Sequence, residues 1–229
     1  MKHRDFGQYC GLARALEVVG ERWALLIIRD LAVRPRRYTD LLEGLPGIPT
    51  NVLSARLREL EQERIIERQV AQAPQRGIVY ALAPDGRSLE PAVLALGRWG
   101  AARLAHPRPG DIVTPESLTM TMRAAFNPGA AAKTHAAWEI HAADIVVHAV
   151  VSGGTLHAGT GPSPVSPDLT ITYTADTLPS LRALIQAAKC RLVRLSGRDN
   201  LLNTFINAFA LPQPPEPATR QPSPGPETG

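Results

Sequence analysis

The chain has 229 residues, of which 44% are apolar, and a formal net charge of +4. Its first 110 residues contain 17 lysines and arginines against 12 acidic residues, whereas the remainder contains 8 against 9. This length and this uneven charge favour two small domains over one large domain. Because Cys10 and Cys190 are the only cysteines and lie in different predicted domains, the sequence suggests neither a disulfide framework nor a cysteine-based metal site.

Helical periodicity dominates the first half of the chain. Apolar residues recur at three- and four-residue spacing, which predicts helices at residues 12–19, 21–31, 39–45 and 50–63. Thr50 is expected to cap the last of these helices with its hydroxyl group. Two strands are predicted at 65–70 and 77–82, joined by the polar loop AQAPQR. A long helix is expected at 84–103, and we expect it to pack on a partner subunit because a monomer offers it little apolar surface.

The order of helix, turn, helix, strand and hairpin is typical of a winged helix-turn-helix DNA-binding domain. The motifs that carry this order are ALEVVGERWALLIIRDL, RRYTDLLEGLPGIPTNVLSARLRELEQERIIER and YALAPDGRSL, behind a cysteine that opens the first helix. This pattern resembles the HxlR family of bacterial transcriptional regulators and covers a little under half of the chain. The resemblance implies a DNA-binding and dimerisation domain at residues 1–105. It also implies a homodimeric, sequence-specific regulator, more typical of a repressor than an activator, that binds a pseudo-palindromic operator in double-stranded promoter DNA.

The helix at 50–63 is the expected recognition helix. Its leucines at 53, 57 and 60 share one face, which must be core. The opposite face would read base edges in the major groove, since Arg can bond guanine and Asn can bond adenine, and small side chains allow close approach. The residues expected to read bases are Thr50, Asn51, Ser54, Ala55 and Arg58.

Basic side chains beside this helix are candidates for contact with the DNA backbone. Arg34, Arg36 and Arg37 precede the third helix, and the matching region of HxlR-like proteins lies beside the phosphates. The alternative is a hydrated loop, or an ion pair with Asp40 or Glu43. On the wing, the arginine at position 76 (Arg76) is placed to enter the minor groove, although a wing without DNA contact is the competing interpretation.

Cys10 matches the N-terminal cysteine of the HxlR pattern. The resemblance makes it a candidate redox sensor, and a cysteine at a helix N-terminus can have a lowered pKa. The alternative is a small packed residue near the dimer contact. Gly11 follows it here, where a proline is often found in the family.

The second half is predicted to be an α+β domain at residues 112–211, after a linker at 106–111. Helices are expected at 118–126, 178–188 and 201–209, and strands at 138–141, 145–151, 155–158, 169–173 and 191–195, with a hairpin turn at 152–154. Residues 212–229 are rich in proline, which predicts a disordered tail.

The segments DLTITYTADTLPSLRALI and CRLVRLSGRDNLLNTFINAF resemble the SCP2-like, sterol-carrier fold, in which a curved sheet and helices enclose an apolar tunnel. This resemblance implies a hydrophobic small molecule as effector. The apolar residues of this half are either cavity lining or solid core. The candidate lining residues are Met122, Phe126, Trp138, Ile145, Phe205 and Phe209.

Enzyme activity is not expected, because the sequence has no glycine-rich phosphate loop, no GxSxG and no HExxH motif. The histidines at 135, 141, 148 and 157 match no metal-ligand spacing, so neither a cofactor nor a metal is predicted. The N-terminal residues lack the apolar segment of a signal peptide, and no apolar run is long enough to span a membrane, which predicts a cytoplasmic protein. The alternative function is a carrier of hydrophobic ligands whose N-terminal domain serves mainly for dimerisation.

Overall fold

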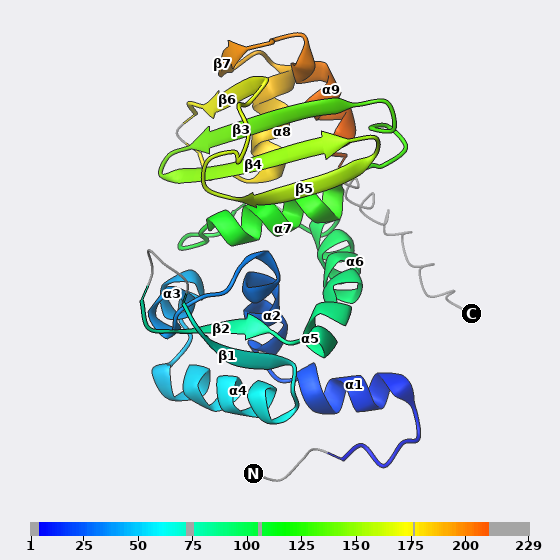
Figure 1. Ribbon diagram of the computed structural model, residues 1–229, viewed down its shortest axis with the longest axis vertical. Coiled ribbons are helices and arrows are strands. Elements are labelled where there is room, and N and C mark those ends of the chain that lie inside the picture. The colour runs from blue at the N-terminus through cyan, green and yellow to red at the C-terminus, as the bar shows by residue number, and fades with distance from the viewer. Residues whose placement is uncertain (1–4, 72–75, 105–106, 176, 211–229) are drawn as a thin grey trace, which may run out of the picture.

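The computed structural model describes residues 5–71, 76–104, 107–175 and 177–210, which form two lobes joined at a waist (Figure 1). The predicted disordered tail at 212–229, the middle of the wing at 72–75 and the first residue of the predicted linker lie outside these ranges. The described part of the chain combines helices and sheets, so the α+β class holds.

The first lobe has the predicted order of helices and hairpin. Its core is formed by apolar side chains of the second, third and fourth helices, of which Ile27, Leu41 and Leu53 are fully buried. The two strands pair antiparallel. The elements are α1 (Gly11–Val19), α2 (Ala24–Val33), α3 (Tyr38–Gly44), α4 (Thr50–Gln62), β1 (Ile66–Val70), β2 (Ile78–Leu82), α5 (Pro84–Ser88) and α6 (Glu90–Ala101).

Three local features of this lobe differ from the sequence prediction. The second helix begins at Ala24, because Trp23 has a left-handed φ of 81° that a right-handed helix cannot contain. Thr50 is the first helical residue of α4, and Pro49 takes the cap position without a side-chain cap bond. The long helix expected at 84–103 is divided at Leu89, because Pro91 lacks an N–H and its ring would clash with the carbonyl four residues earlier.

The second lobe is a five-stranded sheet with helices. The strand order is β5-β4-β3-β6-β7, in which β3 and β6 are parallel and the other neighbours are antiparallel. The predicted hairpin turn is confirmed, with Gly153 and Gly154 at φ 56° and 80° between β4 and β5. The elements are α7 (Pro115–Ala125), β3 (His135–Ala142), β4 (Ile145–Ser152), β5 (Thr155–Thr160), β6 (Leu169–Tyr173), α8 (Leu181–Lys189), β7 (Val193–Gly197) and α9 (Leu201–Ala208).

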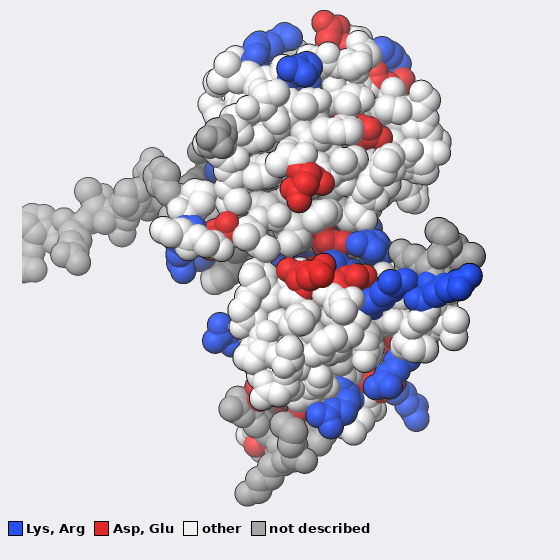
Figure 2. Space-filling view, turned by 90° about the vertical axis from the view of Figure 1, so that its left-hand side faces the viewer, with Lys and Arg blue, Asp and Glu red and all other residues white. Residues whose placement is uncertain are grey.

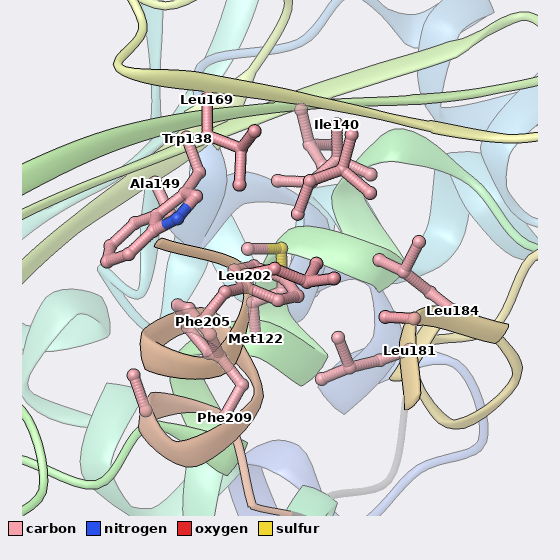
Figure 3. Packing of buried hydrophobic residues seen from close by; sticks show 14 of the residues in the cluster. Met122, Trp138, Ile140, Ala149, Leu169, Leu181, Leu184, Leu202, Phe205 and Phe209 are labelled. Atoms are coloured by element: carbon pink, nitrogen blue, oxygen red, sulfur yellow. The ribbon is translucent and has the colours of Figure 1, made fainter. Parts of the chain in front are cut away.

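The core of the second lobe lies between one face of the sheet and the helices α7, α8 and α9 (Figure 3). Trp138 and Ile140 from β3 meet Met122, Phe205 and Leu184 from the three helices. The last strand starts two residues later than predicted, because α8 continues to Lys189 and a turn follows it. Among the described helices, none has the length and apolar character needed to cross a bilayer.

Candidate DNA-binding interface

Helix α4 has one buried face and one exposed face. Leu53, Leu57 and Leu60 are at most 2% exposed and fix the helix against the core of the first lobe. On the other side, Asn51 and Arg58 are exposed to solvent. The predicted division of this helix into a core face and an exposed face therefore matches the burial of its residues.

A tyrosine that the sequence analysis missed fixes the start of α4. The hydroxyl of Tyr38 on α3 donates to the backbone oxygen of Thr50 over 2.9 Å. It also accepts a hydrogen bond from the hydroxyl of Ser54 at 3.2 Å. The half-buried Ser54 hydroxyl is thus already bonded within the lobe, whereas Thr50 and Asn51 are exposed and Ala55 is partly exposed. The Arg58 side chain follows the helix, and its Nε donates to the Ser54 backbone oxygen at 3.2 Å.

Arg36 does not have the position expected of a DNA-backbone contact. Its residue is 6% exposed, and its Nη1 lies 2.7 Å from Oε2 of Glu116 at the start of α7. Its Nη2 donates to the backbone oxygen of Asp40 over 2.6 Å, and its backbone forms a bridge with Tyr80 of β2. A buried guanidinium with these partners has no surface to offer to a phosphate, so the prediction for Arg36 is corrected to a structural role.

Glu116 and Asp30 complete a buried ionic cluster between the lobes. Glu116 also binds Arg34, whose Nη2 lies 3.0 Å from Oε1. Asp30 on α2 is fully buried, pairs with Arg29 at 2.8 Å and lies 3.9 Å from Nη1 of Arg36. Burial raises the pKa of the Asp30 carboxyl, and the nearby guanidinium groups of Arg29 and Arg36 act in the opposite direction. The partners weighed for these arginines from sequence were Asp40 and Glu43, so Glu116 and Asp30 were both missed.

The wing is tied to the same segment. Nη2 of Arg37 donates to the backbone oxygen of Arg76 over 2.8 Å, and the backbone N–H of Arg37 donates to Asp40. The Arg76 side chain itself is exposed. Figure 2 shows basic side chains along one edge of the lower lobe and acidic side chains at the waist.

Cys10 lies at the N-cap of α1 and is exposed. Hydrogen bonds from the backbone N–H groups of Ala13 and Leu12 lower the pKa of its thiol. This is the electrostatic environment expected of a cysteine at a helix N-terminus.

The six residues predicted to line a cavity mostly pack against one another. Trp138, Phe205 and Phe209 are fully buried, with ring centroids 5.9 Å apart for Trp138 and Phe205 and 4.8 Å apart for Phe205 and Phe209 (Figure 3). Met122 is also fully buried, and Ile145 is 4% exposed. Phe126 is partly exposed and lies at the rim of a different hollow, between the lobes.

The four histidines lie on strands of the second lobe and form no metal-binding group. Within the described ranges, no group of three or more histidine, cysteine or acidic residues could hold a metal ion. Glu139 pairs with His141 at 2.7 Å, and the backbone N–H of Ser163 and this imidazole lower the pKa of the Glu139 carboxyl.

Comparison with known proteins places the first lobe among transcriptional regulators. The HxlR-like helix-turn-helix family matches residues 18–107. The HTH-type transcriptional regulator YodB of Bacillus subtilis is 35% identical over 102 residues, which are 44% of this chain and 88% of that protein. An uncharacterized HTH-type transcriptional regulator of Synechocystis sp., sll1512, is 33% identical over 97 residues, or 42% of this chain and 72% of that protein.

A third relative, the uncharacterized HTH-type transcriptional regulator Rv3095 of Mycobacterium tuberculosis, is 40% identical over 107 residues. The match spans 66% of that protein and 47% of this chain. Among solved structures, the reduced form of YodB from B. subtilis has 34% sequence identity and a TM-score of 0.36, and the match covers 45% of this chain and all of that one. These named relatives are transcriptional regulators rather than enzymes. The chain belongs to the HxlR-like family of helix-turn-helix, DNA-binding transcriptional regulators.

Proposed function

We propose that this protein is a homodimeric repressor that reads a pseudo-palindromic operator with α4. The observation that carries the proposal is the exposed face of α4, where Asn51 and Arg58 stand opposite the buried leucines. Two such helices about one helical turn apart would enter successive major grooves, and the bound dimer would obstruct polymerase at a promoter. We assign base reading to Thr50, Asn51, Ala55 and Arg58, with Ser54 mainly holding the helix through Tyr38.

The proposed dimer contact is formed by α1 and α6. Both helices leave large apolar side chains in water: Leu12 is 69% exposed, Leu16 43%, Leu96 52% and Trp99 61%. Exposed apolar surface of this extent on two helices is typical of a protein–protein contact. In this arrangement Cys10 lies next to the contact, where oxidation of its thiol would alter the packing against the partner subunit.

Contact with the DNA backbone is assigned to Arg34 and Arg37, and entry into the minor groove to Arg76 on the wing. The Arg34 side chain remains 40% exposed beside its ion pair, and Arg37 joins the turn to the wing. Phosphate contacts fix the register of a protein on DNA without reading its sequence. Removing one should therefore weaken binding to all sequences alike and flatten the salt dependence.

The second lobe is proposed to be an SCP2-like domain at residues 112–211 that modulates DNA binding in response to a small molecule with an apolar part. The five-stranded sheet with α8 and α9 packed on one face supports this relationship. The residues first expected to line its cavity are packed as a solid core, so the effector needs another place to bind.

The function is tested by selecting bound sequences from random DNA and measuring affinity for the selected operator. Asn51→Ala and Arg58→Ala should each lower specific affinity by ~1–3 kcal/mol and leave non-specific binding nearly intact. The matched control is Arg194→Ala, which removes an exposed arginine from β7 of the second lobe. Unchanged operator affinity in both α4 variants, or an equal loss in the control, would overturn the assignment of α4.

A further inference from the structure

We infer that the hollow between β5, α6 and α7 binds an aromatic carboxylate. The hollow lies between the lobes and has a volume of about 570 Å³, within the range of roughly 300–1,000 Å³ that is usual for small-molecule sites. Figure 1 shows the three elements meeting where the upper sheet faces α7 and α6. This place is separate from α4 and from the packed interior of the second lobe.

The lining of this hollow combines flat rings, apolar side chains and basic groups. Phe126 from α7 and the imidazoles of His148 and His157 supply rings, and Leu94 and Leu156 supply apolar surface. A planar aromatic body fits such a wall, because aromatic rings gain from both apolar burial and ring–ring contact. The basic side chain Arg123 lies at the same wall.

The free edge of β5 adds backbone donors to this wall. The N–H of Gly161 donates to the carbonyl of Val146 over 2.7 Å, which fixes the alternation of hydrogen bonds between β5 and β4. In this alternation Leu156 and Ala158 direct their backbone groups away from β4. The carbonyl of Ala158 is already bound by Nη2 of Arg123 at 2.7 Å, which agrees with this orientation. The N–H of Leu156 therefore points outward from the sheet edge, where a ligand oxygen can accept from it.

Arg123 explains why the ligand should carry a carboxylate. Its Nη1 donates to Oε1 of Glu90 on α6 at 3.0 Å, and the Glu90 side chain is 33% exposed. A ligand carboxylate can take the place of Glu90 on the guanidinium while the freed Glu90 side chain returns to water. The exchange keeps the charge of Arg123 balanced, and a guanidinium binds carboxylates with charge-assisted hydrogen bonds.

This exchange would reach the DNA-binding lobe through α2. Nη1 of Arg123 also donates at 3.0 Å to the backbone oxygen of Ala32, near the end of α2 and just before the Arg34–Arg37 turn. A ligand that draws Arg123 toward the hollow acts on this turn and removes one of the links between α6 and α7, whereas the bond from Arg98 to the backbone oxygen of Ala124 remains. Only this regulatory consequence rests on the proposed function. If it holds, ligand and operator must change each other's affinity by the same factor.

The site is tested with the full-length chain and no DNA, by calorimetric titration with naphthoate and with naphthamide as its uncharged counterpart. Naphthoate should bind with one site per chain, and naphthamide should bind about tenfold more weakly because it cannot form an ion pair with Arg123. Glu90→Gln should strengthen naphthoate binding about threefold by removing the competing carboxylate. Leu94→Glu should weaken it about tenfold by placing a negative charge in the wall. The control Val165→Glu adds the same charge at a 51% exposed position outside the hollow and should leave the affinity unchanged.

Absence of naphthoate binding, or equal binding by wild type and Leu94→Glu, would overturn the site. If naphthamide binds as tightly as naphthoate, the inference that the ligand carries a carboxylate is wrong. A second titration measures operator affinity with and without naphthoate. If the chain binds naphthoate as described but binds no operator, the proposed function fails and the site stands.

Discussion

Replacing Glu116 with glutamine should destabilise the protein strongly, because it removes the central negative charge of a buried cluster. The Glu116 side chain is 2% exposed, and its oxygens lie 2.7 Å from Arg36 and 3.0 Å from Arg34. Glutamine keeps the size, so no cavity is created and the loss is electrostatic. Removing one partner of a buried ion pair costs about 3–5 kcal/mol, since the other charge remains buried.

The geometry places the expected loss at the lower end of that range. Asp30 stays 3.9 Å from the Arg36 guanidinium and compensates part of its charge, and Arg34 is exposed enough to be hydrated. A loss of about 3 kcal/mol is a large share of the 5–15 kcal/mol that stabilises a typical domain. It should lower the urea midpoint of unfolding by about 1–2 M. Tryptophan fluorescence can follow both lobes, because Trp23 lies in the first and Trp138 in the second.

The control is Glu61→Gln, which breaks an exposed pair with Arg68 whose side chains are 36% and 49% exposed. Such surface pairs contribute about 0–1 kcal/mol, so this variant should unfold close to wild type. If Glu116→Gln loses no more stability than Glu61→Gln, the cluster does not hold the lobes together. A double-mutant cycle with Arg36→Met would then be expected to show no coupling either.

Three further changes address the dimer, the thiol and the first lobe. Trp99→Glu should convert the proposed dimer to a monomer in sedimentation experiments, and a variant that still sediments as a dimer would place the contact elsewhere. In a Cys190→Ser background, alkylation of Cys10 should reach half its maximal rate at a lower pH than a model thiol, because its pKa is lowered; coincident profiles would contradict this. Gly86→Ala should destabilise the first lobe in urea unfolding, since its added Cβ would lie 2.0 Å from the Ile65 carbonyl oxygen; an unchanged midpoint would show that α5 can shift.

Helices and strands of this fold were predictable from the sequence where apolar residues recur at regular spacing. The leucines of α4 recur every three or four residues and are buried, and the strand at 169–173 was predicted to the residue. The errors have local causes in single residues, such as the left-handed Trp23 and the helix-breaking Pro91. The spacing of apolar residues does not reveal where a single residue interrupts or shifts a helix.

In the candidate site, the buried and exposed faces of α4 were predictable from the sequence, and the partners of the arginines were not. The partner of Arg36 is Glu116, which is 80 positions away and in the other lobe, so no short-range spacing could reveal the pair. Nor could the sequence decide between core and cavity lining for residues such as Trp138 and Phe205, since both roles require apolar side chains. That decision depends on how three helices meet one sheet face.

Helix α7 is the element through which the two lobes are physically joined. Its first turn carries Glu116, which binds the turn that leads into α3 and, through Arg36, the backbone of β2. Its last turn carries Arg123, which binds the end of α2, the first turn of α6 and the edge of β5. A boundary drawn at residue 112 from composition assigns this helix to the second lobe, yet its charged side chains are neutralised mainly by the first. Because both ends of α7 bind elements of the first lobe, a displacement of the second lobe would act first on the end of α2, on the Arg34–Arg37 turn and on β2.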